Sequence, residues 1–203
     1  MYKLYEMAYS GHSHRVRLFL SLLGQDYESR PVSLRDGEHL TDAYKKINPF
    51  GKIPVLDDDG HLVRESNAIL VYLALKHKAR EWYPVDDPAR AAEVQMWLNV
   101  AANDILQGPA KAWIATMFVP DETAVRDGLE ASRKLLGVMD GLLDGRDWLV
   151  GDGPTIADVA NYSHISKGPL IGLDLEPYLN VLRWQKNIEA LPRFIAMPTP
   201  EKY

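Results

Sequence analysis

The chain has 203 residues, of which 46% are hydrophobic, so it can form one domain or two small ones around an ordinary packed core. Its formal net charge of -5 argues against a nucleic-acid partner, because nucleic-acid binding favours basic surfaces. The absence of cysteine excludes disulfides, a thiol nucleophile on the protein, cysteine-ligated zinc and Cys-x-x-Cys redox chemistry.

Targeting and membrane signals are not seen in the sequence. Lys3, Glu6, Arg15 and Arg17 interrupt the start of the chain, which therefore lacks the hydrophobic core of a signal peptide. The longest apolar run, residues 68–75, is too short to cross a bilayer. We therefore expect a soluble cytoplasmic protein without a membrane partner.

The first third of the chain predicts alternating strands and helices. A strand is expected at 2–5, a helix from about 13 to 23 and a second strand around 27–34. Gly24 stands where a glycine commonly follows the end of a helix. The apolar stripe of the expected helix consists of Val16, Phe19, Leu20 and Leu23.

Residues 48–73, NPFGKIPVLDDDGHLVRESNAILVYL, predict two strands joined by an Asp59-Gly60 turn, followed by a helix that opens at Glu65-Ser66. A proline in a strand removes a ladder donor, so Pro54 predicts an edge strand whose free backbone groups can pair with an extended peptide. A helix capped by Ser66 offers unpaired N–H groups and a positive dipole end to a carboxylate. This combination predicts a site for a small acidic peptide.

The second half of the chain predicts helices. Asp87 followed by Pro88 is a strong helix start, and Gly108-Pro109 is expected to kink or end that helix. Thr155 to Asp158 has the form of a capping box, which gives Asp158 a structural role. The tail from Ala196 to Tyr203 is expected to be irregular. Two apolar stripes have helical spacing: Val94, Trp97, Leu98, Ala101 and Ile105, and then Leu129, Leu135, Leu136, Met139, Leu142 and Leu143.

Five segments resemble the glutathione transferase family, and the resemblance covers nearly the whole chain. It implies an α/β thioredoxin-like domain at 1–79, a linker at 80–86 and an all-α helical bundle domain at 87–203. The segment 37–56 is especially similar to the theta class. The matching segments are SGHSHRVRLFLSLLG (10–24), GEHLTDAY (37–44), NPFGKIPVL (48–56), ESNAILVYL (65–73) and DGPTIADVANY (152–162).

The resemblance implies that glutathione is the co-substrate and that a group after the first strand contacts its sulfur. The thiolate is the nucleophile, and a hydrogen-bond donor with a helix dipole nearby would lower the thiol pKa. Ser10 matches the serine that contacts sulfur in the theta and zeta classes, with Tyr5 and Tyr9 as alternatives. His12 stands where the zeta class has a cysteine; it is either a donor or stabilising cation for the thiolate, or a solvated loop residue. Ser13 is expected to cap the first helix.

The remaining glutathione contacts also follow from the resemblance. Ile53, before a cis Pro54, would offer its backbone to the cysteinyl residue of glutathione. Glu65 would face the γ-glutamyl ammonium, and Ser66 with the helix start would take the γ-glutamyl carboxylate. Lys52 and His39 match positions that pair with the glycyl carboxylate.

We expect a homodimer that joins bound glutathione to a small hydrophobic electrophile, without a metal. A glutathione-dependent peroxidase or disulfide reductase and a zeta-like isomerase are alternatives on the same site, the isomerase being disfavoured because His12 replaces the expected cysteine. A non-enzymatic binding or scaffold module is the alternative from another class. Candidates for the electrophile pocket are Met7, Trp113, Met117 and Phe118, which can equally be core or dimer contacts.

Overall fold

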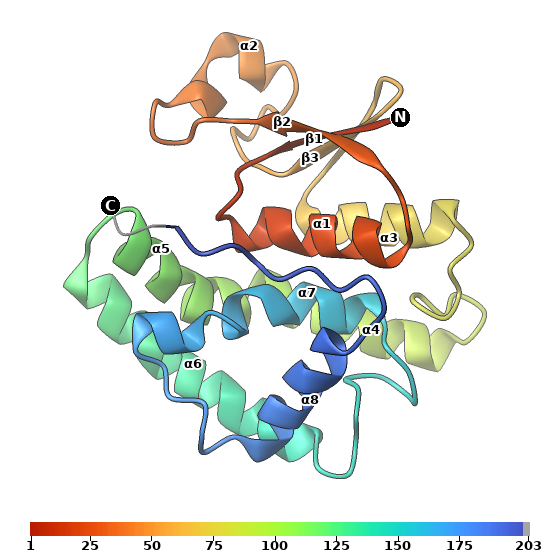
Figure 1. The fold of residues 1–203 in the computed structure, drawn as a ribbon, viewed down its shortest axis with the longest axis vertical. Helices are drawn as coiled ribbons and strands as arrows, with labels where there is room; N and C mark the ends of the chain where they lie inside the picture. The colour runs from red at the N-terminus through yellow and green to blue at the C-terminus, as the bar shows by residue number, and fades with distance from the viewer. Residues whose placement is uncertain (201–203) are drawn as a thin grey trace.

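A four-stranded mixed sheet forms the N-terminal part of the molecule, seen in a computed structural model that describes residues 1–200 (Figure 1). The strand order is β2-β1-β3-β4, with β1 parallel to β2 and antiparallel to β3, and β3 antiparallel to β4. The strands are β1 (Tyr2–Glu6), β2 (Tyr27–Pro31), β3 (Val55–Asp58) and β4 (His61–Arg64).

Helices α1 (Gly11–Leu22) and α3 (Ser66–Lys76) lie between the sheet and the helical part of the molecule (Figure 1). Both helices contribute buried apolar residues, among them Phe19 from α1 and Leu70 from α3. The short η1 (Glu38–Leu40) and α2 (Asp42–Lys45) connect β2 to β3 on the other side of the sheet. Gly24 follows α1 with a φ of 66°, the left-handed conformation expected of a glycine after a helix.

The second half of the chain is helical, as expected. Asp87 caps the first of these helices by accepting hydrogen bonds from the Ala89 and Arg90 N–H groups. Gly108 interrupts the helical backbone (φ -96°, ψ -108°), so the predicted kink is confirmed. The segments are α4 (Pro88–Ala102), η2 (Leu106–Ala110), α5 (Lys111–Met117), α6 (Glu122–Leu142), α7 (Ile156–Ile165), η3 (Gly168–Ile171) and α8 (Leu179–Glu189).

The central helix α7 begins with the predicted capping box. The Asp158 carboxylate is buried and accepts hydrogen bonds from the Thr155 and Leu149 N–H groups and from the Trp184 indole N–H. These contacts confirm its structural role. The predicted stripe from Val94 to Ile105, which extends past the end of α4, is buried. Leu142 at the end of α6 is 52% exposed, which the spacing alone did not predict.

The prediction that Pro54 places its strand at a sheet edge is wrong. β3 lies between β1 and β4, so it is an inner strand. Pro54 comes just before the first paired residue, Val55, and therefore removes no donor from either ladder. The chain that could pair with a ligand is the segment that enters the strand, not the strand itself.

Two predicted helix caps are also wrong. Ser10, not Ser13, is the N-cap of α1, because the helix begins at Gly11. Ser66 is the first residue of α3, and Glu65 precedes it with a φ of 67°, as its N-cap without a side-chain capping bond. The tail is irregular up to residue 200, and residues 201–203 of the predicted irregular tail lie outside the described residues.

Residues 80–86 contain neither strand nor helix, yet they are packed against both halves of the chain. Trp82 lies edge-on to Phe19 of α1, and its carbonyl accepts the Ile156 N–H at the start of α7 (2.9 Å). The boundaries 1–79, 80–86 and 87–203 stay a prediction. No helix within residues 1–200 is long and apolar enough to cross a membrane.

Candidate functional site

Ser10 lies at the positive end of α1, directly after the loop that follows β1. Its Oγ accepts a hydrogen bond from the Ser13 N–H (3.2 Å), as an N-cap side chain does. Because the oxygen is the acceptor in this bond, the hydroxyl proton of Ser10 is left to donate to another group. The side chain is half-buried. Ser10 therefore combines a free donor with the helix dipole.

Ser13 also contacts the loop that follows β1. Its side chain is fully buried, and its Oγ accepts the Met7 N–H at 3.4 Å. Both serines fit the capping preference, and the sequence does not distinguish them. The start of α1 at Gly11 makes Ser10 the cap, and Ser13 lies inside the helix with its side chain against the loop.

His12 is in the first turn of α1, so it is not the solvated loop residue that the sequence left open. Its ring meets the ring of His164 from α7 edge-on, with 4.9 Å between the centroids. Burial, with the positive charges of Arg15 and Lys52 nearby, lowers the pKa of His12 to about 3. The imidazole is thus neutral at neutral pH and can act as an N–H donor, not as a cation.

Arg15 is a buried cation beneath the start of α3, and sequence reasoning did not identify it. One guanidinium nitrogen, Nη1, donates to Asn67 Oδ1 (2.7 Å) and to Ser66 Oγ (3.3 Å). The side chain is 1% exposed, and its Nε and Nη2 atoms have no hydrogen-bond partner in the described residues. Burial lowers its pKa to about 9, so the charge persists at neutral pH. The sequence does contain one clue: Arg15 precedes Phe19 by one helical turn, so it lies on the same helix face as the predicted buried stripe.

The segment from Lys52 to Pro54 enters β3 beside these groups. The Ile53–Pro54 peptide bond is cis, as the resemblance implied. The ladder between β1 and β3 stops at the Tyr5–Val55 pair, so Ile53 lies beyond it. The Lys52 carbonyl accepts the Tyr44 hydroxyl (2.9 Å) and the Asn48 side-chain amide (2.7 Å), which fix the approach to the strand.

His39 stands on η1, close to the same segment. Its carbonyl is 3.1 Å from where a Cβ on Gly51 would lie, so the backbone of His39 packs against the residue before Lys52. The structure therefore brings His39 near Lys52, and Lys52 near enough to His12 to affect its pKa. Arg15 also affects the pKa of His12, and its bond to Ser66 links the start of α3 to the same group.

The predicted electrophile-pocket residues occupy different environments. Trp113 of α5 is 1% exposed, and its indole N–H donates to the Tyr9 carbonyl (3.2 Å). Phe118 lies edge-on to that indole ring. Met7 and Met117 are half-buried. Trp113 therefore supports the Ser10 loop and does not form an open pocket wall.

Two models of the glutathione S-transferase family match the chain. The model of the N-terminal domain matches residues 9–76, and that of the C-terminal domain matches residues 103–192. Glutathione S-transferase F13 of Arabidopsis thaliana is 30% identical over 95% of this chain and 93% of its own length. The chain belongs to the glutathione S-transferase family. All the glutathione-site candidates from Ser10 to Ser66 fall within the N-terminal match.

Solved structures agree with this assignment over almost the whole transferase fold. A possible glutathione S-transferase from Rhodopseudomonas palustris has a TM-score of 0.91 and 31% identity, covering 100% of this chain and 92% of its own. Ure2p in complex with glutathione has a TM-score of 0.84 and 26% identity, covering 95% of both chains. The described residues contain no group of three or more His, Asp or Glu side chains that could hold a metal ion.

Proposed function

We propose that this protein binds glutathione, ionises its thiol and joins the thiolate to a small hydrophobic electrophile. The observation that carries the proposal is the Ser10 hydroxyl, which has a free proton at the N-terminus of α1. The positive charges of Arg15 and Lys52 are felt at His12, two residues after Ser10, and add positive potential to this end of α1. Each of these features stabilises the thiolate more than the thiol.

The remaining residues supply binding along the tripeptide. Ser66 and the free N–H groups at the start of α3 take the γ-glutamyl carboxylate, with Arg15 behind Ser66, and Glu65 faces the ammonium. Ile53 pairs with the cysteinyl backbone. Lys52 and His39 take the glycyl carboxylate. Binding at both ends holds the sulfur beside Ser10.

The reaction then needs one proton transfer and one bond-forming step. The thiol proton leaves to solvent, and Ser10 donates its hydrogen bond to the sulfur anion. The anion attacks the electrophile, which either accepts the electron pair by addition or loses a leaving group. Neutral His12 adds a second donor beside the sulfur. A two-fold homodimer and a cytoplasmic location stay predictions, since they rest on the family and on sequence composition.

Calorimetric titration with glutathione, combined with pH-dependent absorbance of the bound thiolate, tests this function. We expect saturable binding with proton release, and a thiol pKa below that of free glutathione. Ser10→Ala should raise the pKa of the bound thiol by about 1 to 2 units, which corresponds to one charge-assisted hydrogen bond.

The control is Ser10→Thr, which keeps both the hydroxyl and the helix cap and should retain most of the effect. An unchanged thiol pKa in Ser10→Ala would remove Ser10 from the mechanism. Glutathione binding without turnover of any electrophile would favour a binding module over an enzyme.

A further inference from the structure

The peptide unit between Tyr9 and Ser10 is held at both of its polar ends. Its N–H, carried by Ser10, donates to the Met7 carbonyl (3.1 Å) within the loop. Its carbonyl, carried by Tyr9, accepts the indole N–H of Trp113 (3.2 Å) from a residue 104 positions further along the chain. This peptide sets the direction of the Cα–Cβ bond of Ser10, and the Ser13 N–H holds Oγ at the end of that bond (3.2 Å), so the two peptide hydrogen bonds help to place the hydroxyl.

The helix that carries Trp113 is itself firmly placed. The break at Gly108 turns the chain into α5, and α5 packs on α6 at a point where Gly128 has no side chain. A Cβ on Gly128 would lie 2.8 Å from the Ala112 nitrogen, immediately before Trp113. The backbone of α5 therefore cannot move toward α6. Trp113, at 1% exposure, has no room to swing away from Tyr9.

A second residue from the helical part of the chain contacts the residues that follow Ser10. The His164 ring of α7 fills the space where Gly11 has no side chain, and it lies edge-on to the ring of His12. His164 is 2% exposed, so this contact is also fully packed. The loop end from Tyr9 to His12 thus rests on two helices of the C-terminal half.

We propose that Trp113 is a positioning residue that sets the Ser10 hydroxyl for thiolate stabilisation through its hydrogen bond to the Tyr9 carbonyl. The helical half of the molecule thereby contributes to thiol activation. Trp113 does not touch the sulfur; it acts through the Tyr9–Ser10 peptide. This inference rests on the proposed function, because it assumes that Ser10 donates to the glutathione sulfur.

Trp113→Phe tests the inference, since it keeps a flat buried ring and removes only the N–H donor and part of the ring. We expect the thiol pKa of bound glutathione to rise by about 0.5 to 1 unit, the shift for one weakened hydrogen bond. At pH values well below the wild-type thiol pKa, the thiolate fraction, and with it kcat, should fall about 3- to 10-fold, while the affinity for glutathione changes less. Beta-(3-benzothienyl)alanine at position 113 replaces the N–H with sulfur at nearly unchanged shape and provides the same test if the phenylalanine variant does not fold.

The matched control is Trp184→Phe. Trp184 is also fully buried, and its indole N–H donates to Asp158 (2.8 Å) at the start of α7, away from the Ser10 loop. This variant should lose stability and leave the thiol pKa unchanged. An equal rise of the thiol pKa in both variants, or no rise in Trp113→Phe, would overturn the inference. The proposed function would still hold as long as the wild-type protein lowers the thiol pKa of glutathione. A wild-type protein that does not lower the thiol pKa would overturn both.

Discussion

Individual residues determine how closely the two halves of the chain approach each other near Ser10. Gly11 is the clearest example, because a Cβ there would lie 2.4 Å from Nε2 of His164. The His164 side chain is 2% exposed and also packs against His12, so it cannot move aside without disturbing the candidate site. The backbone of Gly11 is helical and would accept any residue. The need for glycine at this position therefore comes from the packing of His164 against it.

Gly11→Ala should lower the free energy of unfolding by about 1 to 3 kcal/mol, the usual cost of inserting a methyl group into a packed core. Alanine favours helices over glycine, so a stabilised protein would contradict the packing explanation. Urea denaturation measures the effect. The matched test is the double variant with His164→Ala, in which the removed ring makes room for the methyl group. Its loss should be smaller than the sum of the two single losses.

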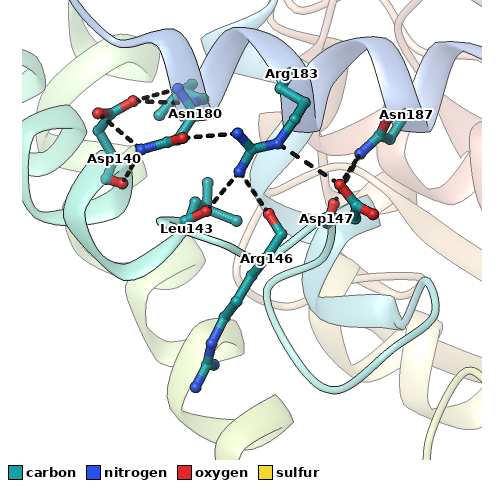
Figure 2. A network of polar contacts seen from close by, with 8 residues as sticks. Asp140, Leu143, Arg146, Asp147, Asn180, Arg183 and Asn187 are labelled. Carbon is teal, nitrogen blue, oxygen red and sulfur yellow. Dashed lines mark hydrogen bonds and ion pairs between the residues drawn. The ribbon is translucent and has the colours of Figure 1, made fainter.

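At the scale of secondary structure, the helices α6 and α8 satisfy each other's ends (Figure 2). The residue before α8, Tyr178, makes no side-chain capping bond. Asp140 of α6 takes this role, because its Oδ1 accepts the N–H groups of Asn180 (2.8 Å) and Val181 (3.0 Å). In return, Arg183 of α8 donates to the Leu143 carbonyl (2.7 Å) after α6.

Asp140→Ala should destabilise the protein by about 1 to 2 kcal/mol, as the loss of an N-cap carboxylate does. The control is Asp147→Ala, because Asp147 pairs with Arg183 at 3.6 Å but its side chain is 70% exposed. Removing that solvated pair should cost less than about 1 kcal/mol. Thermal and urea denaturation measure the loss of stability in each of the two variants. Equal losses would show that the Asp140 contacts add nothing beyond a surface ion pair.

At the scale of the whole molecule, His14 joins three separate segments. It is fully buried on α1, with Nδ1 at 2.9 Å from Ser163 Oγ of α7 and Nε2 at 2.9 Å from the Ile195 carbonyl of the tail. A carbonyl only accepts, so Nε2 carries the proton and Nδ1 accepts the Ser163 hydroxyl. Burial is the main cause that lowers the pKa of His14 to about 4, with Arg17 and Lys167 adding to it and the Ile195 hydrogen bond opposing it.

This lowered pKa makes stability dependent on pH. The unfolded chain takes up a proton on His14 near pH 6.5, whereas the folded protein does so only near pH 4. Stability should therefore be retained above pH 6.5 and lost as the pH falls toward 4, by about 3 kcal/mol from His14 alone. His14→Gln should be less stable than wild type at neutral pH and should lose less stability on acidification. Urea denaturation at several pH values measures both slopes, and equal slopes would contradict the assignment to His14.

Local sequence patterns predicted most elements correctly, because the interactions that determine them span a few residues. The capping box at Thr155, the Asp87-Pro88 helix start and the glycine at position 24 each depend on neighbours within one turn. The same locality explains the failures. A proline such as Pro54 is typical of an edge strand, but the order of the strands is set by pairing between distant segments.

By itself, the sequence determined the class of the fold, the succession of helices and strands, and the family motifs that contain Ser10, Lys52 and Ser66. Only the tertiary structure decided that Arg15 is a buried cation beneath Ser66, that His164 packs against His12, and that Trp113 holds the Tyr9 carbonyl. The physical reason is sequence separation. Periodicity and capping reflect contacts within a helical turn, whereas these contacts join residues 51 to 152 positions apart, and only the packing of the completed helices brings them together.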